Sequence, residues 1–255
     1  MTKKSTRKEE AKLCLDVLKE HFDIELIPKR TLCIYGPPAV GKSIFCGLLC
    51  GELALKYKCP IEIIAFEQHY QDGEYRKMIE EFIKAKCPDA VINISYVESV
   101  YPPALMKFLA GKLKPEAQKI YVIDSLSAYA DRLGDYYLTI MGTDDIRPIT
   151  ARVAPLARIL SRKLADACGK SDSIGIVIAH ASSTAGTGKI RGVIDFKPSF
   201  TQRVAHNLFY MVFLDLGTDG NHYMTCVINR LNKEAEGRAI VCQISKEGVK
   251  VLKSK

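Results

Sequence analysis

The chain has 255 residues, of which 47% are hydrophobic and 26% are charged, and its formal net charge at pH 7 is +8. These values are typical of a globular protein with a packed core, built as one large domain or two small ones. The polar start MTKKSTRKEEAK and the lack of a long apolar stretch indicate neither a signal peptide nor a membrane span, and nine cysteines without a CxxC pair favour reduced thiols in a cytoplasmic protein over a zinc site.

From residue 31 onward, short apolar runs alternate with longer amphipathic stretches. Strands are predicted at 31–35, 61–66, 90–97, 119–124 and 174–180, and helices at 42–58, 74–86, 102–113 and 147–168. Because Pro155 lies inside the last helix, we expect a kink there or a helix that begins near it. Near-continuous apolar strands separated by helices indicate an α/β fold with a mostly parallel central sheet flanked by helices.

The pattern changes after residue 200. Three apolar runs, at 206–216, 222–230 and 238–245, are separated only by short polar segments that contain GTDGN and NKEAEG. Such connections can join antiparallel strands but leave no room for crossover helices. We therefore expect one core at 31–255, in which antiparallel C-terminal strands extend the parallel sheet, after a short basic and helical segment at 1–30.

The segment GPPAVGKS, residues 36–43, matches the phosphate-binding pattern G-x-x-x-x-G-K-[ST] and lies between a predicted strand and a predicted helix, as that motif requires. Glycines let such a loop, a P-loop, approach phosphates closely, and the helix that follows supplies free N–H groups and a positive dipole end. Lys42 would reach the β- and γ-phosphates, and Ser43 would bind Mg²⁺. The predicted nucleotide-binding residues are Gly36, Pro37, Pro38, Ala39, Val40, Gly41, Lys42, Ser43 and Ile44.

Three further polar side chains end predicted strands, at the edge of a parallel sheet where ligands gather. Asp124 ends the strand 119–124 and is a candidate metal ligand together with Ser43. Glu67 follows the strand 61–66, and if that strand neighbours the P-loop strand, its carboxylate can polarise an attacking water. His180 ends the strand 174–180, on the expected γ-phosphate side. A turn-capping Asp, a solvent-facing Glu and a structural His are the alternatives that the residues leave open.

Positive charge is concentrated in the segments 1–12, 182–203 and 229–255, so the rest of the chain is slightly acidic. A local excess of this kind permits contact with a polyanion, although a solvated basic surface is the alternative. Two long loops are also predicted, at 129–149 and 181–200, and the first contains Tyr136 and Tyr137 beside basic residues. Aromatic and basic residues together suit stacking on single-stranded nucleic acid, with packed surface tyrosines as the alternative. The candidate DNA-binding residues are Arg132, Lys189, Arg191, Lys197 and Arg203.

In this order and spacing, the segments YGPPAVGKS, IIAFEQ, IYVIDSLSAY and GIVIAHASST resemble the RecA/RadA/KaiC superfamily of ATPases, over residues 30–255. The tail that ends in KEGVKV looks like the C-terminal strands of archaeal RadA-type recombinases, and YGPPxxGKS is most similar to archaeal single-domain RadA paralogs. The resemblance implies a RecA-like P-loop NTPase core that binds ATP and Mg²⁺ between the subunits of a homo-oligomer. Glu67 matches the water-activating glutamate, Asp124 the Walker B aspartate, and His180 the γ-phosphate-sensing position, while the two predicted loops match the family's DNA-binding loops.

Departures from full recombinases narrow the role that the resemblance implies. Only 30 residues precede the predicted P-loop strand, so we expect neither the helical DNA-binding domain nor the N-terminal polymerisation motif of those proteins. The predicted function is a DNA-modulated ATPase that binds single-stranded DNA and assists homologous recombination and DNA repair, as an accessory to a RadA-type recombinase. A KaiC-like regulatory ATPase that acts on a protein partner, and a nucleotide-binding module that does not hydrolyse, are the alternatives.

Overall fold

The computed structural model describes residues 10–99, 101–142, 146–181 and 206–254. Within these residues, one nine-stranded sheet has the order β3-β2-β4-β5-β1-β6-β7-β8-β9. The strands are β1 (Thr31–Gly36), β2 (Ile61–Ala65), β3 (Ile92–Tyr96), β4 (Ile120–Asp124), β5 (Ile174–His180), β6 (Tyr210–Leu216), β7 (His222–Asn229), β8 (Ala239–Ser245) and β9 (Gly248–Ser254). The helices are α1 (Cys14–Phe22), α2 (Lys42–Tyr57), α3 (Gly73–Lys84), α4 (Pro102–Lys112), α5 (Leu126–Met141) and α6 (Ile146–Ser171), with short 3₁₀ turns η1 (Gln68–Gln71) and η2 (Lys233–Ala235).

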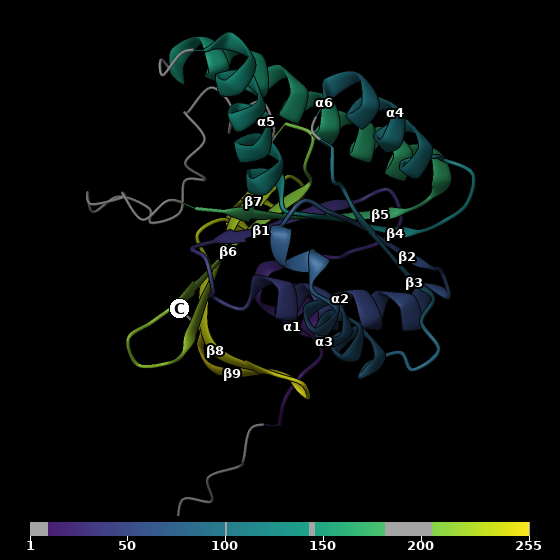
Figure 1. The fold of residues 1–255 in the computed structure, drawn as a ribbon. Coiled ribbons are helices and arrows are strands. Elements are labelled where there is room, and N and C mark those ends of the chain that lie inside the picture. Colours follow the sequence, from purple (N-terminus) through teal and green to yellow (C-terminus); the bar gives the residue numbers. More distant parts are fainter. Residues whose placement is uncertain (1–9, 100, 143–145, 182–205, 255) are drawn as a thin grey trace, which may run out of the picture.

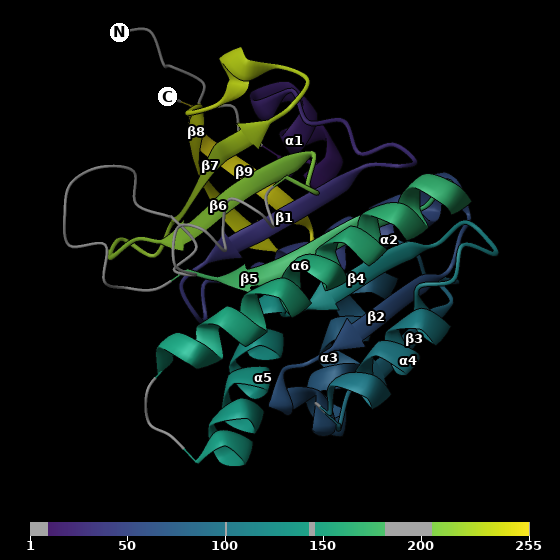
Figure 2. The ribbon, with the colours of Figure 1, turned by 90° about the horizontal axis from the view of Figure 1, so that it is seen from above.

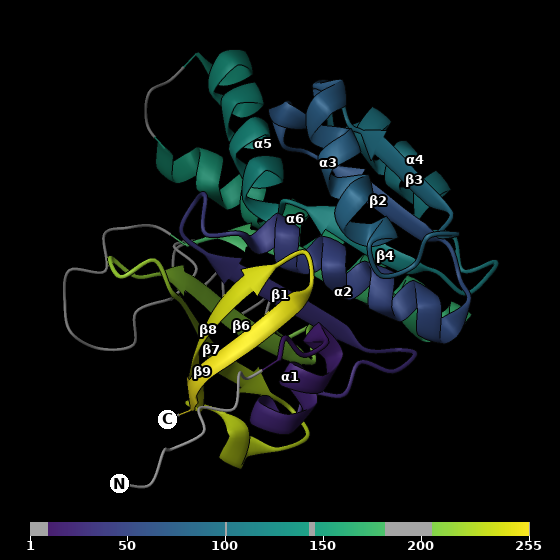
Figure 3. The same cartoon turned by 90° about the horizontal axis from the view of Figure 1, so that it is seen from below.

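Helices cover both faces of the sheet, which therefore separates two hydrophobic layers (Figure 1). The helices α4, α5 and α6 lie over one face (Figure 2), and α1, α2 and α3 lie over the other (Figure 3). Because β1, β2 and β4 are covered on both sides, every residue in them is buried, which explains their near-continuous apolar sequences. None of the described helices is both long enough and apolar enough to span a membrane.

The C-terminal strands extend the sheet as predicted, with one addition. β6 pairs with β1 in parallel, and β7, β8 and β9 follow in antiparallel order. The sequence pattern did not predict β9 as a separate strand. It pairs with β8 across a tight turn, in which Gly248 has φ +135 and a Cβ would lie 2.3 Å from the carbonyl oxygen of Lys12. Glycine is thus required where the first described residues meet the last strand.

The described part of the N-terminal segment packs into the same core as the P-loop helix. Cys14, Val17, Leu18 and Phe22 of α1 are fully buried in the hydrophobic cluster that includes α2. The buried carboxylate of Glu52, in α2, accepts the backbone N–H groups of Cys14 and Leu15 at 2.8 and 2.9 Å. These two N–H groups lie in the first turn of α1, where the backbone N–H groups of a helix have no hydrogen-bond partner within the helix. A side chain of α2 therefore caps α1.

The prediction of a long loop at 129–149 was wrong, because α5 continues to Met141 and α6 begins at Ile146. Ser125 caps α5 by accepting the backbone N–H of Ala128, and the buried residues Leu126, Tyr129, Ala130 and Leu133 recur at helical spacing. The helix α6 also runs through Pro155 rather than starting there. The carbonyl that loses its partner at this proline belongs to the exposed Ala151, where water can replace the missing N–H.

Candidate active site

The P-loop connects the carboxyl end of β1 to the first turn of α2. Ala39 and Gly41 have left-handed backbone conformations, with φ of 60 and 81, and such residues curl a loop so that its N–H groups can converge on an anion. A Cβ on Gly36 would lie 1.8 Å from the carbonyl oxygen of Leu214 in β6. The glycine at this position therefore allows β1 and β6 to approach each other directly beneath the loop.

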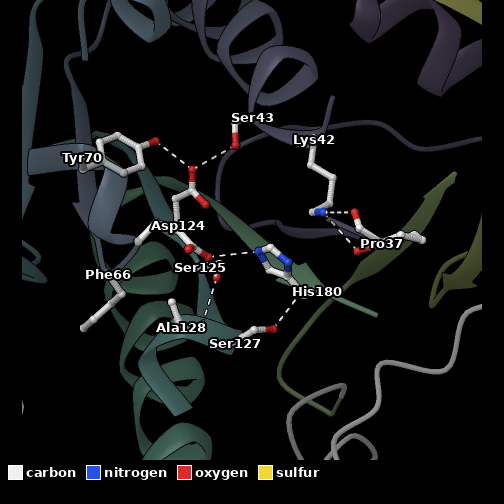
Figure 4. Close-up of polar contacts among 12 residues, drawn as sticks. Pro37, Lys42, Ser43, Phe66, Tyr70, Asp124, Ser125, Ser127, Ala128 and His180 are labelled. Carbon is white, nitrogen blue, oxygen red and sulfur yellow. Dashed lines mark hydrogen bonds and ion pairs between the residues drawn. The ribbon is translucent and has the colours of Figure 1, made fainter. Parts of the chain in front are cut away.

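Lys42 lies inside the loop rather than in solvent. Its side chain is buried, and Nζ donates hydrogen bonds to the carbonyl oxygens of Gly36 at 3.0 Å and Pro37 at 2.5 Å (Figure 4). Burial lowers the pKa of Lys42 to about 8, an effect that the nearby carboxylates of Asp124 and Glu67 oppose. The amine is thus held among carbonyl groups that phosphate oxygens can replace.

Asp124 and Ser43, the two predicted metal ligands, are in contact. Asp124 is buried at the end of β4, and its Oδ2 accepts hydrogen bonds from Ser43 Oγ at 3.2 Å and from Tyr70 OH at 2.7 Å (Figure 4). No described residue donates a hydrogen bond to Oδ1. Burial raises the pKa of Asp124, and the hydrogen bonds from Tyr70 and Ser43 oppose this.

The oxygen donors of Asp124 and Ser43 suit Mg²⁺, which is usually held by one or two carboxylates together with substrate phosphates and water. Among the described residues, no group of three or more His, Cys, Asp or Glu side chains could hold a metal by itself. A magnesium ion at this place would therefore depend on the phosphates of a bound nucleotide. Tyr70, in η1, was not predicted as part of this site, because no motif marks it.

Glu67 and His180 form a second pair beside Asp124. His180 Nε2 lies 3.0 Å from Glu67 Oε1, and Ser125 Oγ donates to the same oxygen. Figure 4 shows His180 above Ser127, whose hydroxyl accepts the backbone N–H of His180 at 2.8 Å. Burial, the largest single influence, raises the pKa of Glu67, but the hydrogen bonds from His180 and Ser125 together bring it below its ordinary value. Glu67 is therefore ionised at neutral pH.

The strand that precedes Glu67 is not a neighbour of the P-loop strand, so this premise of the sequence analysis was wrong. β4 and β5 lie between β2 and β1. The backbone N–H groups of Phe66 and Glu67 donate to the carbonyl oxygen of Asp124 at 2.6 and 3.3 Å, which holds the end of β2 against β4. The side chain of Glu67 then reaches past β4 to His180 at the end of β5. Glu67 follows β2, and Asp124 ends β4, the strand that pairs with β2.

Arg132 is engaged by the protein itself, which argues against its prediction as a DNA-binding residue. Its guanidinium donates hydrogen bonds to the carbonyl oxygens of Phe66 at 3.3 Å, Val97 at 2.5 Å and Glu98 at 2.7 Å, and lies 5.4 Å from the ring centroid of Tyr96. These contacts attach α5 to the ends of β2 and β3. The other candidates, Lys189, Arg191, Lys197 and Arg203, lie outside the described residues.

An aromatic cluster lies where the first DNA-binding loop was predicted. The ring centroids of Tyr101 and Tyr136 are 6.3 Å apart, and those of Tyr136 and Tyr137 are 5.3 Å apart. The guanidinium carbon of Arg152 lies 5.7 Å from the Tyr137 centroid, and Tyr101 is 53% exposed. The tyrosines are therefore carried by α5 and by the turn before α4, not by a long loop.

No protein-family model matches the chain, and no curated protein matches it in sequence. Among solved structures, the crystal structure of a KaiC-like protein from the hyperthermophilic archaeon Pyrococcus horikoshii is similar, with a TM-score of 0.63 and 16% sequence identity, over 96% of this chain and 99% of that chain. At this identity the likeness shows the fold alone. It supports the RecA-like α/β architecture expected from the sequence, and it does not favour the RadA paralogs over other branches of that superfamily.

Proposed function

We propose that the chain binds ATP with Mg²⁺ and hydrolyses it at the P-loop. The observation that carries this proposal is the hydrogen bond between Ser43 and Asp124, 3.2 Å long, beside the ionised Glu67. A phosphate-binding loop alone requires only Lys42 and the glycines. The adjacent carboxylates add a place for a metal and an acceptor for the proton of an attacking water, and these are the further parts that hydrolysis needs.

Each side chain then has a defined task. Lys42 exchanges the carbonyl oxygens of Gly36 and Pro37 for phosphate oxygens and balances their charge. Ser43 and Asp124 would hold Mg²⁺, which neutralises charge on the transferring phosphoryl group when it is bound. Glu67 accepts a hydrogen bond from the attacking water and orients it, and His180 holds the Glu67 carboxylate in place.

The test is ATP turnover by wild type, Lys42→Ala and Lys56→Ala. Lys56 is exposed on the same helix, so it is a matched control. We expect turnover to be lost in Lys42→Ala and kept in Lys56→Ala, because only the first amine lies within the phosphate-binding loop. Hydrolysis that is undiminished in Lys42→Ala would contradict the assignment.

We further propose that the ATPase binds single-stranded DNA, forms a homo-oligomer and assists a RadA-type recombinase in recombinational repair. The aromatic cluster around Tyr136 and the positive charge of 182–203 support this proposal. The measurement is ATP turnover with no DNA, with single-stranded DNA and with double-stranded DNA, together with particle size. Stimulation by single-stranded DNA is the expected result. A stable oligomer whose turnover is indifferent to DNA would favour a regulatory ATPase that acts on a protein partner.

The DNA contact has its own test in the basic segment. Replacing Lys189 and Arg191 by Ala removes two positive charges, so affinity for single-stranded DNA at low salt should fall and its dependence on salt concentration should become shallower. Lys56 and Lys77, which are exposed and lie outside the three basic segments, provide a control pair of equal charge. Equal effects of both pairs would indicate a response to net charge and not to a binding segment.

A further inference from the structure

A histidine at the start of β7, His222, lies beside the P-loop on the side away from Glu67. A Cβ placed on Gly41 would lie 3.3 Å from Nε2 of His222 and 4.0 Å from its Cδ2, so the ring edge faces the left-handed glycine of the loop. No motif in the sequence marks this residue.

The topology explains why His222 reaches this place. β6 runs parallel to β1, so both strands end at the edge of the sheet that carries the P-loop. β7 is antiparallel to β6, and its first residue, His222, pairs with Leu216 at the end of β6. Figure 3 shows the connection between β6 and β7 at the same edge as the connection between β1 and α2.

The two ring nitrogens of His222 have different surroundings. Nδ1 is enclosed and has no hydrogen-bond partner within the described residues, whereas Nε2, which faces the P-loop, is not enclosed. Burial lowers the pKa of the ring, so the ring is neutral at pH 7 and carries one proton. An enclosed N–H without an acceptor is more costly than an enclosed lone pair, which favours the proton on Nε2. His222 therefore presents one unused N–H donor beside the loop.

The position of this donor indicates which part of a nucleotide it meets. Glu67, Asp124 and His180 end strands on one side of β1, whereas β6 and β7 lie on the other side. A nucleotide whose terminal phosphate lies toward Glu67 extends across the loop, so its sugar end lies toward β6 and β7. We propose that Nε2 of His222 donates a hydrogen bond to an oxygen at the nucleoside end of the bound nucleotide, on the α-phosphate or the ribose. This inference rests on the proposed nucleotide site.

The test compares the affinities of ATP, ADP and inorganic triphosphate for wild type and four variants. His222→Phe keeps a planar ring but removes the donor, and His222→Asn carries an amide that is too short to reach the position of Nε2. His222→Gln places an amide N–H near that position. His206→Phe is the matched control, because His206 is exposed and precedes β6 at the opposite edge of the sheet.

We expect the Phe and Asn variants to bind ATP and ADP about tenfold more weakly, as for loss of a hydrogen bond to a charged or polar ligand group, while the Gln variant and the control remain close to wild type. Weaker binding of inorganic triphosphate as well would place the acceptor on the α-phosphate, and unchanged binding would place it on the ribose. The folded state of each variant is checked by its thermal midpoint without nucleotide.

Three negative outcomes are distinguishable. If folded Phe and Asn variants bind ATP as wild type does, the role of His222 is overturned while the nucleotide site stands. If wild type itself binds no nucleotide, the proposed function fails first. A Gln variant that is as weak as the Phe variant would also overturn the proposed hydrogen bond, since the effect would then follow from loss of the imidazole and not of the donor.

Discussion

His180 Nε2 lies 3.0 Å from Glu67 Oε1, although Glu67 follows β2, His180 ends β5, and β4 lies between these two strands. The contact spans the carboxyl ends of three adjacent strands, and Asp124 ends the middle one. Three groups thus lie side by side: Glu67, which would orient the water, His180, which holds Glu67, and Asp124, which would bind the metal. Each of the first three predictions tests one of these parts.

Replacing Glu67 by Gln should leave ATP binding intact and lower turnover by a factor of about 10²–10⁴, the usual contribution of a positioned acid or base. The amide keeps the shape of the side chain but cannot take a proton from water. Affinity and turnover are measured on the same preparation. Glu98→Gln, at an exposed position after β3, serves as the control. A Glu67→Gln variant with full turnover would show that another group orients the water.

His180→Ala should lower kcat and leave KM nearly unchanged, because His180 holds Glu67 and is a positioning residue in this step. His180→Gln keeps a donor near the position of Nε2, so it should recover part of kcat. The informative measurement is kcat and KM of the folded enzyme, determined separately. A purely structural defect would reduce the fraction of folded protein but would leave the kcat of each folded molecule unchanged. Equal loss in both variants would contradict a role through the hydrogen bond.

Asp124→Asn and Ser43→Ala should each raise the Mg²⁺ concentration that supports half-maximal turnover. Tyr70→Phe removes only the hydrogen bond to Asp124 Oδ2, so its effect should be smaller and of the same sign, within the roughly 10–100-fold range seen when partners of metal ligands are lost. The measurement is turnover against Mg²⁺ concentration at fixed ATP. A Tyr70→Phe variant more affected than Asp124→Asn would reverse the proposed order of roles.

Arg132→Ala should destabilise the fold by about 1–3 kcal/mol, because three backbone carbonyl groups lose a charged donor. Its affinity for single-stranded DNA should not change while the protein remains folded. Urea unfolding and DNA titration are carried out together, with Arg152→Ala, which is exposed beside Tyr137, for comparison. Unchanged stability with weaker DNA binding would restore Arg132 to the DNA-binding set.

Glu52 provides a prediction about pH and stability. Burial raises the pKa of Glu52 in the folded chain, so the folded state holds its proton more tightly than the unfolded state does. Stability from this group is therefore greatest in acid and is lost as the pH rises through the raised pKa. The free energy of unfolding of wild type, relative to Glu52→Gln, should decrease as the pH rises above 4.5, the ordinary pKa of a glutamate carboxyl. Urea unfolding at several pH values measures it, and a difference that grows with pH would contradict the raised pKa.

The sequence predicted the parts of the site whose geometry is local or follows from parallel pairing. The P-loop is such a case, since its spacing dictates a loop between a strand and a helix. Asp124, Glu67 and His180 could be placed at one edge because the ends of parallel strands meet there. The strand order itself was not accessible, so the adjacency of β1 and β2 could only be stated as a condition, which the structure does not meet. The alternation of strands and helices in the sequence indicates a parallel sheet. The order of the strands within that sheet depends on long-range packing, which the alternation does not reveal.

Residues that act through a single tertiary contact were missed. Tyr70 reaches Asp124 from a short 3₁₀ turn, and His222 reaches the P-loop from two strands away. Neither lies in a periodic pattern or at a motif spacing. The basic and aromatic residues of α5 predict a loop, although Tyr129 and Leu133 lie at helical spacing. A helix on the surface of a sheet needs only one apolar stripe, and its exposed side can have the composition of a loop.

The capping of α1 by Glu52 also determines where this protein can be shortened. Lys12 pairs with Val249 through two backbone hydrogen bonds of 2.9 Å, and Phe22 and Leu18 fill the layer beneath α2. A fragment that begins at residue 31 would retain the whole P-loop, yet it would lose the bridge between Lys12 and β9 and would leave the buried Glu52 carboxylate without the two N–H donors of α1. A shortened protein should therefore keep Lys12 and α1 together with the P-loop, because all of them share one core.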